Sequence, residues 1–253
     1  MLRNVALVVA HPGHELVVHH LMERSRPLYF CLTDGSGGNG LPRIDSTNAL
    51  LQRVGVTRGA IYGRFSDREL YRLLLDGDAN VFEELARELA GSLIESGIET
   101  VAGDAMEGFN PGHDVCRAVI DNAVAIVEAE TGRALQNYEF AIDNAPSGDA
   151  SINLELDDAA VDRKIAAAMA YREMRAEVEA ALRRSGRSAY AVESLRPAST
   201  RAMLKRFELT PPGYEAVGEQ RVAEGRYRDV IRYREHVLPV FRVLGVGAGS
   251  YAA

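Results

Sequence analysis

Residues 5–15 read VALVVAHPGHE, and the pattern in this stretch sets the expected architecture. Residues 5–10 form an unbroken apolar run rich in β-branched side chains, and Pro12 and Gly13 end it. Such a run is typical of a strand buried on both faces, as the strands of a parallel sheet are. The stretch therefore predicts a parallel first strand with two histidines directly after its carboxyl end.

The following segments alternate between strand-like and helix-like patterns. We expect further strands at residues 28–32, 60–65, 100–103 and 138–142, and helices at residues 46–54, 67–94 with a break near Gly77, and 113–130. Strands that alternate with helices predict a doubly wound α/β fold, with a mostly parallel sheet whose strand order is 3-2-1-4-5.

The segment beyond residue 150 has a different pattern. Residues 157–184 read as one long helix rich in Ala, Glu and Arg, and a final helix near residues 227–244 follows a stretch of loops. A length of 253 residues suits one domain over residues 1–253, with a core of about residues 1–150 and a C-terminal helical and loop elaboration over about 151–253. The many Arg and Tyr residues of this region suit a solvated face, a substrate pocket or a subunit interface of a homo-oligomer.

Composition narrows the classes of partner. The net charge is −7 and no block of Lys or Arg occurs, which argues against nucleic acid and anionic membrane surfaces as partners. Cys31 and Cys116 are too few for a disulfide framework, which indicates a reducing compartment. The first apolar run is too short for a signal peptide, and no stretch approaches the roughly 20 apolar residues of a membrane span. We therefore expect a cytoplasmic protein that acts on a small molecule.

Three histidines are expected to meet at one edge of the sheet. His11 and His14 follow the first strand in the motif HPGH (residues 11–14), and His113 ends the motif NPGH (residues 110–113) after the fourth strand. Ligands of doubly wound sheets bind outside the carboxyl ends of the strands, where the strand order reverses. Three imidazoles there predict a metal site that suits Zn²⁺, with Fe²⁺, Ni²⁺ and Mn²⁺ as alternatives.

The same motifs carry a resemblance to a known family. AHPGHE (residues 10–15) resembles the AHPDDE signature of the PIG-L/LmbE family of zinc-dependent N-deacetylases, and NPGH (residues 110–113) is similar to its second motif, HPDH. TDG (residues 33–35) resembles the family's loop after strand two, and the agreement spans roughly residues 5–145. The resemblance implies a Rossmann-like fold, zinc ligation by His11 and His113, and His14 as the third ligand in place of an Asp.

Two positions depart from the family pattern. Gly13 stands where the family has the general-base Asp, and Asn110 stands where it has a His that assists the transition state. An amide cannot shuttle a proton at neutral pH, although Asn110 could still donate an N–H group to an oxyanion. Asp104 ends the fourth strand and could replace the base or cap a loop, whereas Glu15 and Asp114 could also orient a ligand. The full set of nearby candidate bases is Glu15, Asp34, Asp104, Glu107 and Asp114.

Three functions follow as hypotheses. The first is a metal-dependent hydrolase that removes an N-acyl group, in the first instance N-acetyl, from an amino-sugar-like or glycoside-like small molecule, with metal-activated water as the nucleophile. The second is a divergent biosynthetic metalloenzyme that uses the same pocket for a rearrangement or a redox step, which accounts better for Gly13 and Asn110. A non-catalytic binding module is the third, but it gives no reason to keep three convergent histidines.

Overall fold

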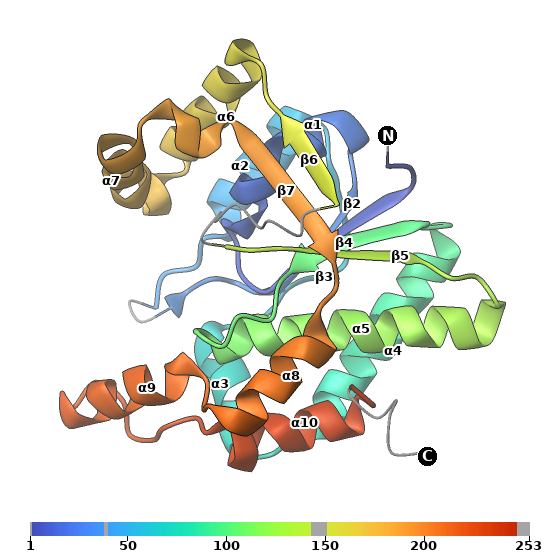
Figure 1. Cartoon of the computed structure of the whole chain (residues 1–253), viewed down its shortest axis with the longest axis vertical. Coiled ribbons are helices and arrows are strands. Elements are labelled where there is room, and N and C mark those ends of the chain that lie inside the picture. The colour runs from blue at the N-terminus through green and yellow to red at the C-terminus, as the bar shows by residue number, and fades with distance from the viewer. Residues whose placement is uncertain (1, 38–39, 143–150, 247–253) are drawn as a thin grey trace.

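The computed structural model describes residues 2–37, 40–142 and 151–246. A mostly parallel sheet runs through it in the order β3-β2-β1-β4-β5-β7-β6, with helices on both faces (Figure 1). The first five strands pair in parallel, β7 pairs antiparallel with β5, and β6 pairs antiparallel with β7. The expected α/β fold and the expected order 3-2-1-4-5 are confirmed.

The elements have the following bounds. The strands are β1 (Val5–Val9), β2 (Leu28–Thr33), β3 (Thr57–Phe65), β4 (Thr100–Asp104), β5 (Gln136–Phe140), β6 (Ile152–Glu155) and β7 (Val192–Pro197). The α-helices are α1 (His19–Ser25), α2 (Ile44–Val54), α3 (Asp67–Leu75), α4 (Ala79–Glu95), α5 (Pro111–Thr131), α6 (Asp158–Ala170), α7 (Arg175–Ser185), α8 (Thr200–Leu209), α9 (Gly213–Ala223) and α10 (Leu238–Val243). The expected break near Gly77 separates α3 from α4.

The central strand β1 shows why the sheet is covered on both sides. Ala6 and Val8 pack into a core with α3, α4, α5 and α10, while Leu7 and Val9 pack into a second core with α1, α2 and α6. All four side chains are completely buried. Side chains alternate across a strand, so an unbroken apolar run fills both cores at once. No helix within the described ranges is long and apolar enough to cross a membrane.

The C-terminal part differs from the sequence-based expectation. Residues 157–184 do not form one helix, because the chain leaves the helical conformation at Tyr171, where α6 ends. Tyr171 buries its ring and shares a hydrogen bond with Thr47 Oγ1 at 2.8 Å. This tertiary contact overrides a continuous helical propensity.

Strand β7 was missed because its inward-facing positions are Glu193 and Leu195, both buried, so no apolar alternation is visible. Its short partner β6 was not predicted either, and α8 and α9 lie in the stretch that the sequence predicts as loops. The final helical segment starts at Tyr233 rather than near residue 227, and α10 follows a π-helical turn over Tyr233–Val237.

Candidate metal centre

The three predicted histidines come together at the carboxyl ends of β1 and β4. His11 directly follows β1, His14 begins a 3₁₀ turn over His14–Val18, and His113 lies in the first turn of α5. Their ring centroids lie 5.3 Å apart for His11 and His14, 5.1 Å for His11 and His113, and 4.5 Å for His14 and His113. Residues about 100 positions apart in the sequence thus form one imidazole cluster.

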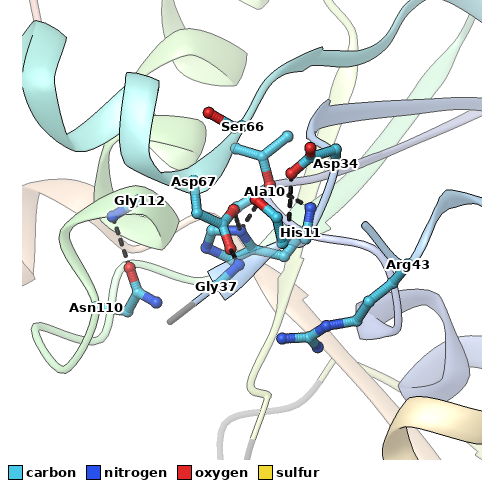
Figure 2. A network of polar contacts seen from close by, with 12 residues as sticks. Ala10, His11, Asp34, Gly37, Arg43, Ser66, Asp67, Asn110 and Gly112 are labelled. Carbon is cyan, nitrogen blue, oxygen red and sulfur yellow. Dashed lines mark hydrogen bonds and ion pairs between the residues drawn. The ribbon is translucent and has the colours of Figure 1, made fainter. Parts of the chain in front are cut away.

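The ring of His11 is fixed by groups from two other elements. Its Nδ1 lies 2.8 Å from Asp67 Oδ1 at the start of α3 (Figure 2). The same nitrogen lies 2.8 Å from Thr33 Oγ1 at the end of β2. Burial raises the pKa of Asp67, but the hydrogen bond from His11 and those from Thr33 and Gly37 N outweigh this effect and lower the pKa to about 2. An ionised Asp67 holds the proton of His11 on Nδ1. Nε2 is then unprotonated, and its lone pair is free to bind a metal ion.

His14 has an equivalent carboxylate partner. Its Nδ1 lies 2.8 Å from Asp104 Oδ2 at the end of β4, and the same oxygen accepts a 2.8 Å hydrogen bond from Ala10 N. Asp104 is completely buried, and its other oxygen, Oδ1, has no hydrogen-bond partner. Asp104, which the sequence suggested as a replacement base or a loop cap, therefore lies against His14 and orients its ring.

His113 is the most deeply enclosed member of the cluster. Burial lowers its pKa well below the usual range, and the nearby His14 and His11 lower it further. A neutral imidazole is the form that binds a metal ion. Its Nδ1 is buried without a hydrogen-bond partner, and the ring of Phe109 meets the His113 ring edge-on at 4.9 Å.

The chemistry of this cluster fits a divalent cation. Two atoms of the imidazoles, His11 Nε2 and His113 Nδ1, are buried without hydrogen-bond partners. The same is true of Oδ1 of Asp104, which lies against His14. Unpaired buried acceptors are unfavourable, and a bound cation would satisfy such atoms. Within the described residues, however, no group of three or more His, Cys, Asp or Glu side chains is already arranged around a common ion position.

Two of the predicted catalytic carboxylates hold backbone turns next to the histidines. Glu15 is fully buried, and its oxygens accept hydrogen bonds from Gly13 N, Tyr29 Oη and Thr47 Oγ1 at 2.8–3.0 Å. Burial raises the pKa of Glu15 above its usual value. These contacts fix the turn that presents His14.

Asp114 holds the second turn. Its Oδ1 accepts hydrogen bonds from Glu107 N at 2.9 Å and Gly108 N at 3.0 Å, which fixes the loop that leads into α5. Burial raises the pKa of Asp114 to about 7, although these two hydrogen bonds lower it. The contact between Asp114 and the loop places His113 against the other two imidazoles.

The two remaining candidate bases, Asp34 and Glu107, lie in the loops that follow β2 and β4. Asp34 accepts a 2.8 Å hydrogen bond from Ser36 N and shapes the turn after β2, while Glu107 accepts a 3.4 Å hydrogen bond from Ile142 N. The glycine-rich loop at residues 34–40 includes Gly38 and Asn39, which lie outside the described residues.

Asn110 keeps a free donor at the cluster. It is the N-cap of α5, and its Oδ1 accepts a 2.8 Å hydrogen bond from Gly112 N (Figure 2). The same oxygen accepts a 3.1 Å hydrogen bond from Tyr71 Oη. With Oδ1 engaged in this way, its Nδ2 amino group makes no hydrogen bond to the described residues. The predicted role of Asn110 as an N–H donor is compatible with this arrangement.

Two residues of the site were not identified from the sequence. Asp67 binds His11 and also accepts a 2.6 Å hydrogen bond from Gly37 N, and its signal was the capping box that Ser66 and Glu69 form after the third strand. The second is Arg43, which lies on the other side of His11 from Asn110 (Figure 2). A Cβ atom on Gly37 would lie 3.7 Å from both Arg43 Nη2 and Asp67 Oδ2, so the guanidinium borders the site.

The described elements define a Rossmann-like α/β protein with an imidazole cluster at the strand-order reversal. The conserved protein TT1542 from Thermus thermophilus is similar in structure, with a TM-score of 0.56 and 22% identity over 78% of this chain and 93% of that chain. The zinc-inhibited form of teicoplanin deacetylase Orf2 has a TM-score of 0.50 and 15% identity over 78% of this chain and 99% of that chain. At these identities the likeness shows a shared fold.

A deacetylase-bog complex from the biosynthesis pathway of teicoplanin has a TM-score of 0.51 and 15% identity over 78% of this chain and 99% of that chain. No protein-family model and no curated protein matches the sequence.

Proposed function

We propose that this protein is a metal-dependent hydrolase that removes an N-acyl group, in the first instance N-acetyl, from an amino-sugar-like small molecule. The observation that carries the proposal is the imidazole cluster, in which His11 and His14 are each oriented by a carboxylate 2.8 Å away. Carboxylate-histidine pairs of this kind orient metal ligands and raise their basicity. The deacetylase activity named for Orf2, which shares the fold, supports the same function.

His11, His14 and His113 would hold the ion, with Zn²⁺ as the first choice and Fe²⁺, Ni²⁺ or Mn²⁺ as alternatives. When bound, the ion supplies Lewis acidity that polarises an amide carbonyl and makes water a better nucleophile. Asp67 and Asp104 keep the protons of His11 and His14 on Nδ1, so that Nε2 of each ring can bind the ion.

The chain's own polar groups border the place where the substrate would lie. Asn110 Nδ2 would donate a hydrogen bond to the carbonyl oxygen as negative charge develops on it. Arg43 contacts Met174 Sδ at 3.4 Å and forms no ion pair with a carboxylate of the described residues. Its guanidinium would bind oxygen atoms of the substrate on the side of the site opposite Asn110.

A second function is favoured by the lack of an evident general base. Gly13 has no side chain, and Glu15, Asp104 and Asp114 each use an oxygen to hold a backbone turn or a histidine. The alternative is a divergent biosynthetic metalloenzyme that uses the same ion for a rearrangement or a redox step. Under both proposals the partner is a small molecule.

Metal content and acetate release test the proposal together. We would measure the elemental content of the purified protein and of His14→Ala, and then acetate release from N-acetylglucosamine and related N-acetyl amino sugars. The hydrolase proposal predicts bound zinc that is depleted in His14→Ala, together with acetate release. Iron without hydrolysis would favour the alternative, and acetate release by metal-free protein would refute both.

A further inference from the structure

Phe109 is an exposed aromatic side chain beside the imidazole cluster. It keeps 48% of its surface accessible, although the other phenylalanines of the cores around it, such as Phe207 and Phe241, are buried. Its ring meets His113 edge-on, with centroids 4.9 Å apart and an interplanar angle of 85°. The ring therefore borders the candidate site and also faces solvent.

The backbone on both sides of Phe109 is held by contacts with other elements. Gly108 N donates to the buried Asp114 Oδ1, and Gly108 O accepts a 3.0 Å hydrogen bond from Tyr214 N. A Cβ atom on Gly108 would lie 2.7 Å from the Phe207 ring, so the turn packs as closely as glycine allows. Asn110, the next residue, caps α5. The turn thus presents an exposed apolar ring beside the imidazole cluster, and covering this ring with an apolar surface of a ligand would be favourable.

We propose that Phe109 is a stacking surface for a saturated ring of the substrate, such as a pyranose, and that it selects N-acyl groups carried on a ring. The C–H bonds on one face of a pyranose are weakly positive and pack on the negative face of an aromatic ring. The inference rests on the proposed function, because it needs the acyl group to reach the imidazoles while the ring lies over Phe109. It adds Phe109 as the residue that recognises the ring of the substrate.

The sequence offers a direct reporter, because the chain contains no tryptophan. Phe109→Trp would place the only indole of the protein next to His113. Val243→Trp is a matched control, since Val243 is 45% exposed and lies on α10. Each variant would be titrated first with Co²⁺, a paramagnetic ion that quenches nearby indoles, and then with N-acetylglucosamine or with N-methylacetamide, which has the same amide without the ring.

The proposal predicts Co²⁺ quenching in Phe109→Trp and a saturable fluorescence change with N-acetylglucosamine that N-methylacetamide does not produce. Val243→Trp should respond to neither probe. Quenching without any difference between the two amides would overturn the stacking role and leave the hydrolase proposal standing. An absence of Co²⁺ quenching would count against the metal site itself, and with it against the inference.

Kinetics supply a second test. Covering a phenylalanine side chain with a ligand increases the affinity for that ligand by about tenfold relative to a site without the side chain. Phe109→Ala should therefore raise KM for a cyclic N-acetyl substrate by about tenfold with little change in kcat, and Phe109→Tyr should restore it. An unchanged KM in Phe109→Ala would refute the role.

Discussion

Replacing Asp104 by Asn removes the carboxylate that orients His14 and so tests its contribution to metal binding. The side chain keeps its shape, but the negative charge that holds the proton on His14 Nδ1 is lost. Removing a hydrogen-bond partner of a metal ligand typically lowers metal affinity by about 10- to 100-fold, which equals about 1.4–2.7 kcal/mol. The new amino group would also occupy the buried Oδ1 position, which has no partner, at a cost of about 1–3 kcal/mol in folding stability.

The assay separates these two effects. Zinc affinity would be measured by competition with a chelator, and stability by urea unfolding followed by far-ultraviolet circular dichroism. Asp121→Asn serves as the control, because Asp121 is a hydrogen-bonded carboxylate of α5 whose partners include Asn137 and Thr200. The control should lose stability and keep its zinc affinity. If Asp104→Asn binds zinc as tightly as the wild type, the reasoning on the His14–Asp104 pair is wrong.

Two further substitutions test the glycine of the first Pro-Gly-His turn and the buried ion pair between Lys164 and Glu193. Gly13→Asp should increase acetate release by restoring a carboxylate, while its left-handed backbone (φ 105°) lowers folding stability by about 1–3 kcal/mol; acetate release that falls in folded protein would contradict this. Lys164→Met should destabilise the protein by about 3–5 kcal/mol in urea unfolding, because it leaves Glu193, 2.8 Å from Lys164 Nζ, buried without its cation. A loss much smaller than this would show that the hydrogen bonds from His20 N and Leu21 N are enough to stabilise Glu193.

The parallel half of the fold could be predicted mainly from β1, β2 and β4, because these strands are buried on both faces and read as largely apolar runs. The antiparallel extension could not, since β7 directs Glu193 into the protein, where Lys164 and the first amides of α1 bind it. A charged residue at an inward-facing position looks like a solvent-exposed one in sequence. Only the tertiary partner shows that its charge is compensated.

The candidate site shows the same limit. The convergence of His11, His14 and His113 followed from the order of β1 and β4, because residues after neighbouring parallel strands meet at one edge. Asp67 follows β3, which is two strands away from β1, and strand order alone gave no reason to place it at His11. In the structure Asp67 contacts His11 Nδ1 directly, and Thr33 at the end of β2 contacts the same nitrogen.

The two Pro-Gly-His turns look equivalent in the sequence, yet their glycines meet different needs. Gly13 has a left-handed backbone that side chains rarely adopt, whereas Gly112 lies in α5, where a Cβ atom would come within 3.0 Å of His11 Nε2. Both stand where the resembling family motifs carry Asp. The backbone at one position and the closeness of an imidazole at the other therefore disfavour a carboxylate within the cluster. The acidic groups of this site lie instead behind the imidazoles, as Asp67 and Asp104.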